Sequence, residues 1–198
     1  MSTVKSKKLQ VGTDASASNN FTIYQPATPD GTLRIGVGNA DSPTEVGQFN
    51  TNGYKPQQPV AFDVYNGSAQ SVSHGTWTKI ALDTETYDTN SNFDSTTNYR
   101  FTPTVAGYYQ INGVVRFSQV NQLFICAIYK NGSQHKSGGR NQIVGTAYEQ
   151  NVLVSSVVYM NGSTDYIELY AYQSSGSSRN VSAGPSLSYF NGILIAQA

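Results

Sequence analysis

The sequence predicts an all-β protein, and three observations carry that prediction. The chain holds 14 Tyr and 8 Phe, and aromatic side chains are enriched in strands. Short runs in which apolar and polar residues alternate recur along the chain, and Gly, Asn and Pro separate them. No segment shows a sustained helical period with capping residues. We therefore expect many short strands that pack as a sandwich or jelly roll.

The charge balance limits the partners to expect. Charged residues make up 12% of the 198 residues, against a typical ~25%, and Lys+Arg equals Asp+Glu at 12 each. A neutral chain has no long-range field that attracts nucleic acid or an anionic membrane. No apolar run approaches the ~18 residues of a membrane span, and the N-terminal lysines precede no signal-peptide core. We expect a soluble protein that binds no nucleic acid and inserts into no membrane.

Residues 1–55 are predicted to form a small β-rich attachment segment. Strand candidates lie at residues 9–11, 21–24 and 32–37, and turn-forming residues separate them. Because the segment holds few large apolar residues, we expect it to be ordered by packing on copies of itself or on a partner. Its basic and apolar residues are the attachment candidates: Lys5, Lys7, Lys8, Leu9, Val11, Phe21, Ile23 and Tyr24. Residues 51–59 are predicted to be a linker.

From Val60 onward, strand candidates follow at short and regular spacing. They are residues 60–65, 77–82, 99–101, 107–117, 122–130, 152–159, 165–173 and 187–196. Asn-Gly pairs at 66–67, 131–132 and 161–162 predict hairpin turns. Residues 56–198 are therefore expected to form one sandwich domain.

Alternation assigns the faces of these strands. In residues 165–173 the apolar set is the better core, which leaves three tyrosines and Glu168 on the other face. Tyrosine brings apolar area and a hydroxyl that suits a wet boundary, so such a row favours a subunit interface. The interface candidates are Tyr108, Gln110, Asn112, Tyr166, Tyr170 and Tyr172. The core candidates are Trp77, Phe101, Tyr109, Ile111, Val115, Phe190 and Leu194.

No pattern of catalytic residues stands out, so we expect neither an enzyme nor a cofactor. The single cysteine, Cys126, lies among apolar neighbours and is predicted to be a buried hydrophobe. The two histidines, His74 and His135, lie in Gly/Ser-rich segments without a companion motif. Every Asp and Glu is expected in a turn or on an exposed face. The acidic loop 83–94 lacks the spacing of an EF-hand, so no metal site is predicted there.

Five pieces of residues 59–198 resemble the C1q/TNF-like jelly roll. They are PVAF from Pro59, WTKI from Trp77 with Tyr87-Asp88 and Phe93, FTP from Phe101 with AGYY from Ala106, AIYKNG from Ala127, and YFNGILI from Tyr189. The resemblance implies a homotrimer whose sheets pack around a three-fold axis. Gln110 and Gly113 stand where the family usually has bulky apolar residues, and the collagen-like stalk of many members is absent.

The segment KKLQVGTDASASNNFTIYQPATPDGTLRIGVGN, residues 7–39, resembles segments of virion fibre and decoration proteins of tailed phages, cyanophages included. Combined with the C1q-like part, this resemblance points to a phage particle. Because a small segment that buries little surface by itself precedes a compact knob, and the surface is neutral and low in charge, we expect a homotrimeric capsid decoration, or cement, protein on the outer surface of a phage head. Its N-terminal segment would grip the major capsid protein, and its knob would point outward. The alternative is a tail-fibre knob that recognises a host surface glycan through loops 83–98, 133–147 and 174–186. A glycan depolymerase is the third, least favoured class.

Overall fold

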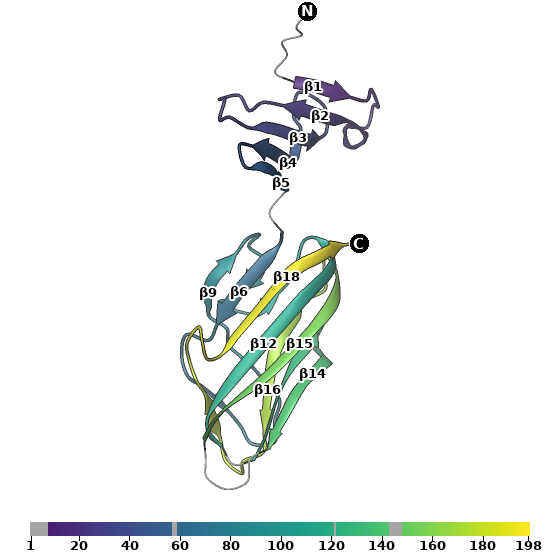
Figure 1. The fold of residues 1–198 in the computed structure, drawn as a ribbon. Coiled ribbons are helices and arrows are strands. Elements are labelled where there is room, and N and C mark those ends of the chain that lie inside the picture. Colours follow the sequence, from purple (N-terminus) through teal and green to yellow (C-terminus); the bar gives the residue numbers. More distant parts are fainter. Residues whose placement is uncertain (1–7, 57–58, 121, 143–147) are drawn as a thin grey trace, which may run out of the picture. The chain divides into compact units, whose positions relative to one another are not determined.

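The computed structural model describes residues 8–56, 59–120, 122–142 and 148–198. The chain divides into two compact units, Met1–Gln58 and Pro59–Ala198. Figure 1 draws both units. The division falls within the expected linker, close to the expected boundary after residue 55.

The N-terminal unit is an antiparallel sheet whose five strands follow in chain order. The strands are β1 (Lys8–Val11), β2 (Phe21–Tyr24), β3 (Leu33–Val37), β4 (Thr44–Asn50) and β5 (Gly53–Pro56), and a 3-10 turn, η1 (Ala17–Asn19), precedes β2. The sequence predicted the first three strands only. Residues 53–56, expected in the linker, pair with β4 instead, because Gly53 at φ +104° completes a tight turn after Asn50.

The C-terminal unit consists of two antiparallel sheets. The larger has the order β7-β17-β12-β18-β6-β9, with β15 on β12, and the smaller has the order β10-β11-β16-β13-β14, with β8 on β16. Figure 1 shows β6, β18, β12 and β15 side by side. The bounds are β6 Ala61–Tyr65, β7 Gln70–Val72, β8 Thr78–Lys79, β9 Thr84–Asp88, β10 Phe93–Asp94, β11 Arg100–Phe101, β12 Ala106–Val120, β13 Leu123–Lys130, β14 Ser133–Gln142, β15 Tyr148–Asn161, β16 Ile167–Gln173, β17 Arg179–Val181 and β18 Tyr189–Gln197.

The inward faces of the two sheets form one apolar core. Predicted core residues Phe101, Tyr109, Ile111, Val115 and Phe190 are fully buried there, and Leu194 packs against them partly exposed. The Phe62 and Phe101 rings stack 4.2 Å apart between centroids. The Tyr109 hydroxyl donates to the Val105 carbonyl at 2.8 Å, which satisfies the polar end of a buried ring. Alternation along β12 was therefore a sound guide to the core.

The prediction that Trp77 belongs to the core is wrong. Trp77 is half-buried on the outer face of the smaller sheet, where its ring lies 5.5 Å from that of Tyr172. The neighbouring strand β8 pairs with β16, and Ile80 and Leu82 face the core. Because side chains alternate along an extended segment, Trp77 shares the outward side with Lys79.

Two turn predictions are also wrong. Only Asn131-Gly132 closes a hairpin between paired strands, β13 and β14, with φ values of 52° and 77°. The pair at 66–67 joins β6 to β7, which do not pair with each other, and the pair at 161–162 joins β15 of the larger sheet to β16 of the smaller. Residues 133–142, expected as a loop, form β14. This edge strand is polar along its length, so no apolar alternation marks it.

Candidate functional site

The interface candidates lie on two different outer faces of the C-terminal unit. Tyr108, Gln110 and Asn112 project from β12 of the larger sheet, whereas Tyr166, Tyr170 and Tyr172 belong to β16 or its approach in the smaller sheet. The structure therefore does not bring the six residues together. Each outer face has its own composition and is a candidate site of its own.

The outer face of the larger sheet exposes large apolar side chains on three adjacent strands. Tyr108 lies opposite Tyr159 of β15, and their ring centroids are 5.5 Å apart. Further along, Val157 lies opposite Gln110, and Leu153 lies opposite Val114. The exposed fractions are 47% for Tyr108, 58% for Leu153, 45% for Val157, 44% for Tyr159, 42% for Ile193 and 55% for Ile195. We call these six residues the apolar flanks. Only Tyr108 among them was a predicted interface residue.

A polar ladder crosses the same face between the apolar flanks. Gln110 Nε2 donates to Ser155 Oγ at 2.9 Å, and Ser155 Oγ donates to Asn112 Oδ1 at 2.8 Å. Asn112 Nδ2 donates to Asn191 Oδ1 at 3.1 Å, and Asn191 Nδ2 donates to Asp63 Oδ1 at 3.3 Å. The ladder thus joins β15, β12, β18 and β6. Because its members satisfy one another, this row of polar groups can be covered by a partner at reduced desolvation cost.

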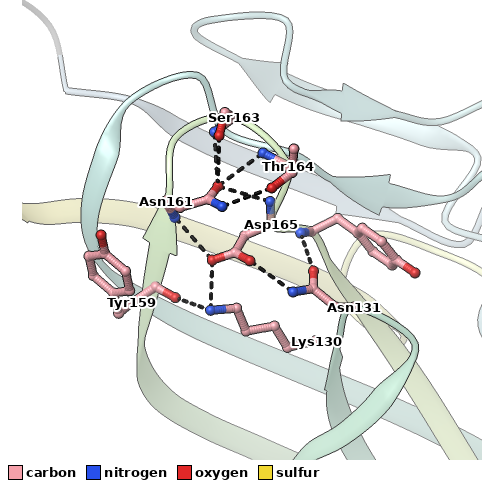
Figure 2. A network of polar contacts seen from close by, with 8 residues as sticks. Lys130, Asn131, Tyr159, Asn161, Ser163, Thr164 and Asp165 are labelled. Atoms are coloured by element: carbon pink, nitrogen blue, oxygen red, sulfur yellow. Dashed lines mark hydrogen bonds and ion pairs between the residues drawn. The ribbon is translucent and has the colours of Figure 1, made fainter.

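A second polar network fixes one end of the smaller sheet (Figure 2). Asp165 is 9% exposed, and its carboxylate accepts from Lys130 Nζ at 2.8 Å, Asn131 Nδ2 at 2.8 Å and Asn161 N at 3.0 Å. Asn161 Oδ1 in turn accepts from the backbone N–H of Ser163 at 3.0 Å. The network ties the β13–β14 turn to the connection between β15 and β16.

Two opposing effects act on the pKa of the Asp165 carboxyl. Burial on its own would raise the pKa of this carboxyl, but the hydrogen bonds from Lys130, Asn131 and the Asn161 backbone outweigh it and lower the pKa. Glu168 is also buried, at 5% exposure, and Lys79 Nζ lies 3.0 Å from its Oε1. The expectation that every carboxylate lies in a turn or on an exposed face is therefore wrong for Glu168, a buried strand residue. Glu168 lies on the outer face of β16, and the pairing of β8 with β16 brings Lys79 to its carboxylate.

An aromatic cluster covers the outer face of the smaller sheet. The rings of Tyr129 and Tyr170 stack 3.9 Å apart, and Trp77 lies 5.9 Å from Tyr129. Burial raises the pKa of both Tyr129 and Tyr170. Ile125 and Ala127 also face this side of the sheet and are buried at 6% and 0% exposure. At one end of the cluster is a pocket of about 340 Å³, lined by Trp77, Leu123, Ile125, Gln134, Ser137, Arg140 and Tyr172.

The attachment candidates of the N-terminal unit divide between the two faces of its sheet. Leu9 pairs with Ile23, and Val11 with Phe21, so these four share one face. They are 59%, 38%, 57% and 50% exposed, respectively. Lys8 and Tyr24 pair on the opposite face, and Lys5 and Lys7 lie outside the described residues.

Leu33 and Phe49 were not among the attachment candidates, yet they belong to the same face as Leu9 and Phe21. The two residues pair with each other across β3 and β4 at 48% and 43% exposure. Alternation from Ile35 back to Leu33 could have revealed the first. A hollow of about 640 Å³ opens among Leu9, Ile23, Leu33 and Phe49. The six residues Leu9, Val11, Phe21, Ile23, Leu33 and Phe49 are called the attachment face below.

The reactive side chains of the described residues have structural surroundings. Cys126 is fully buried, and burial raises the pKa of its thiol to about 12, so the nucleophilic thiolate is disfavoured. In the acidic loop, Asp94 accepts from the backbone N–H of Thr97 at 2.9 Å, and this bond leads those that hold its pKa well below the usual range. Within the described ranges, no three His, Cys, Asp or Glu side chains group as a metal ion would require. None of the helices described there is long and apolar enough to cross a membrane.

Comparison with known proteins places the fold. No protein-family model matches the chain, and no curated protein matches it. The globular domain of zebrafish complement 1qA matches with a TM-score of 0.55 at 16% identity, covering 71% of this chain and 100% of that chain. Eiger TNF from S. frugiperda matches with a TM-score of 0.54 at 10% identity, covering 72% and 96%. Murine APRIL at pH 5.0 matches with a TM-score of 0.56 at 10% identity, covering 70% and 100%. The chain therefore contains a jelly-roll domain with the fold of the C1q and TNF proteins.

Proposed function

We propose that the protein is a homotrimeric structural protein of a phage virion, with capsid decoration as its role. The observation that carries the proposal is the pair of uncovered apolar faces, one on each unit. The outer face of the larger sheet would hold three copies of the jelly roll together. The attachment face would bind the major capsid protein of the shell, which the protein would stabilise from outside.

The trimer contact is supported by the composition of the larger sheet's outer face. Apolar patches of more than a few hundred Å² on a soluble protein mark interaction sites, and the apolar flanks extend over β12, β15 and β18. The polar ladder between them supplies directional groups that can set the register of neighbouring copies. This arrangement agrees with the trimer that the resemblance to C1q/TNF domains implies.

Shell attachment is supported by the exposure of the apolar face of the N-terminal sheet. An antiparallel sheet with one apolar face normally packs that face on a core. Here Leu9, Val11 and Phe21 are at least half exposed. Covering such a side chain fully is worth about 1.5–3 kcal/mol, so a capsid surface that covers several of them gains affinity. In a trimer the three faces act together, and avidity multiplies the effect.

Sedimentation of the full chain tests the trimer. We expect the mass of three copies for the parent and a shift to single copies for Leu153→Asp, because a charge in the apolar flanks is desolvated on assembly. Ser178→Asp adds the same charge at an exposed residue elsewhere and should leave the mass unchanged. A parent that sediments as one copy at micromolar concentration would contradict the proposal.

Binding to capsid shells that lack the protein tests attachment. We expect the parent and Thr28→Asp to cosediment with the shells, and Phe21→Asp to remain in the supernatant. Gold-labelled antibody on whole particles adds the location: label spread over the head supports decoration, and label confined to the tail contradicts it.

The second candidate function is a receptor-binding knob that recognises a host surface glycan. The observation that favours it is the pocket beside Trp77, which combines aromatic walls with polar side chains. Of the loops first expected to contact the glycan, residues 133–142 instead form β14, and this strand contributes Gln134, Ser137 and Arg140 to the pocket.

A further inference from the structure

We propose that the pocket beside Trp77 binds a carboxylated sugar unit of an acidic glycan. The proposal deepens the glycan-binding role given above as the second candidate function and rests on it. It does not depend on the trimer contact or on attachment to a shell. Three features of the pocket support this assignment: its aromatic walls, its apolar floor and Arg140.

Two aromatic rings form the walls. Trp77 precedes β8 and Tyr172 lies in β16, and their ring centroids are 5.5 Å apart with 44° between the ring planes. The pocket floor includes Ile125, which is 6% exposed, so the base of the pocket is apolar. Aromatic ring faces pack against the C–H face of a pyranose ring, which is the apolar side of an otherwise polar ligand.

The walls are held in place by their neighbours. Trp77 leans on Tyr129 at 5.9 Å, and Tyr129 stacks on Tyr170 at 3.9 Å with 19° between the ring planes. Rings supported in this way lose little conformational freedom when a ligand binds, and this preorganisation favours affinity. The volume of about 340 Å³ suits a single sugar ring and lies at the low end for ligand pockets.

Arg140 supplies the charge that selects the ligand. Each of the other four arginines has a contact: Arg34 with Asp30 and Glu45, Arg116 with Glu149, Arg179 with Ser175, and Arg100 over the Tyr166 ring. Across the described part of the chain, Arg140 alone among them has no such contact. No Asp or Glu is among the described residues that line the pocket. A guanidinium fork with free donors matches a carboxylate in a bidentate geometry.

The remaining polar groups favour a sugar over another carboxylate. Gln134 and Ser137 line the pocket from the same strand as Arg140, and their amide and hydroxyl can donate to and accept from ring hydroxyls. A uronic or sialic acid combines a carboxylate, hydroxyls and an apolar C–H face in one ring. These are the three features that Arg140, the Gln134–Ser137 pair and the aromatic walls complement.

The fluorescence of Trp77 gives a direct test, because Trp77 is the only tryptophan in the chain. The full-length protein is titrated with glucuronate, galacturonate and N-acetylneuraminate and with oligosaccharides of each, and with glucose and galactose as neutral counterparts. Calorimetry repeats each titration, so that the result does not depend on the indole. We expect saturable changes with the acidic sugars, and affinity for the neutral ones weaker on the order of tenfold or more.

Matched variants locate the site. Arg140→Gln should weaken binding of the acidic sugars on the order of tenfold, and Lys136→Gln, which removes a charge from β14 outside the pocket, should not. Tyr172→Ala should weaken binding, while Tyr172→Phe keeps the ring and should retain it. Circular dichroism checks that each variant is folded.

The outcomes separate the pocket from the function on which it rests. Equal affinity for neutral and acidic sugars, or undiminished binding by Arg140→Gln, overturns the assignment of a carboxylate to Arg140. Binding that survives both Arg140→Gln and Tyr172→Ala leaves the knob a glycan binder whose site lies elsewhere. Failure of every sugar to bind in both measurements overturns the site and the glycan-binding role together.

Discussion

The two units of the chain use the same strand pattern with opposite results. In the C-terminal unit, apolar faces meet between two sheets, and Phe62 and Phe101 are 0% exposed. In the N-terminal unit a single sheet presents its apolar residues outward, and Leu9 and Phe21 remain 59% and 50% exposed. Alternation therefore marks a face that needs covering. A second sheet covers the inward faces of the C-terminal unit, whereas its apolar flanks and the attachment face of the N-terminal unit remain exposed. Under the proposed function, another copy of the chain or the capsid shell supplies the complement of each exposed face.

The largest effect on stability is expected from a substitution in the core of the C-terminal unit. Tyr109→Ala should lower the free energy of unfolding by about 3–5 kcal/mol, because it leaves a cavity beside Phe101 and removes the bond to the Val105 carbonyl. Denaturant unfolding of the full chain, followed by Trp77 fluorescence, measures the change. A variant as stable as the parent would show that Tyr109 does not contribute to the core as described.

Next in size is the loss of the Asp165 carboxylate. Asp165→Asn should cost about 1–3 kcal/mol at neutral pH, since Lys130 and Asn131 lose the charged acceptor that the buried Asp165 carboxylate provides. Because the folded pKa of Asp165 is lowered, its ionised form stabilises the fold above the unfolded pKa of about 3.9. That contribution disappears as the pH falls through the folded pKa.

The difference in unfolding free energy between parent and Asp165→Asn should therefore be constant near neutrality and shrink in acid below about pH 4. Chemical unfolding at a series of pH values measures it. A difference that grows as the pH falls would mean that the carboxyl is protonated in the folded protein, contrary to the network in Figure 2.

A smaller effect is expected from the polar ladder. Asn112→Ala removes bonds to Ser155 and Asn191, and because Asn112 is partly exposed, water can replace it. We expect a loss of about 0.5–1.5 kcal/mol in unfolding free energy. If three copies cover this face, the same substitution should weaken trimer association further, which sedimentation at falling concentration measures. Equal trimer stability in parent and variant would place the ladder outside the interface.

The smallest effect is expected on the attachment face. Phe21→Ser should change the unfolding free energy of the isolated protein by no more than about 0.5 kcal/mol, because half of the ring already lies in water. The same variant should lose most of its binding to shells. A destabilisation of several kcal/mol without any shell would show that the face is covered within the chain or its own oligomer, and the contrast between the two units would disappear.

How far the sequence predicts this molecule depends on the length of the alternating run. The inward set of β12 could be assigned because buried apolar residues recur at alternate positions over residues 109–117. Trp77 was misplaced because β8 is only Thr78–Lys79, although alternation from Ile80 and Leu82 places it outward. Strand β14 has no apolar residues to alternate and was taken for a loop.

The pocket beside Trp77 could not be predicted, because its lining comes from four separate segments. Residue 77, the start of β13, β14 and residue 172 of β16 meet only through the register that pairs Ile125 with Tyr172 on one side and with Arg140 on the other. Pairing register between distant strands is a property of the assembled sheet and not of any local run. The polar ladder has the same origin, since its members come from four strands.

Because Cys126 is buried, its reaction with thiol reagents can be used to follow unfolding of the chain. Its sulfur lies in the core and its thiol stays protonated, so an alkylating reagent reacts only with molecules that have opened. The rate of modification under native conditions therefore reports how often the jelly roll opens. Because Cys126 is buried and is the only cysteine of the chain, the folded surface has no competing thiol. A single cysteine introduced on either outer face could then carry a spectroscopic label without altering the native sequence elsewhere.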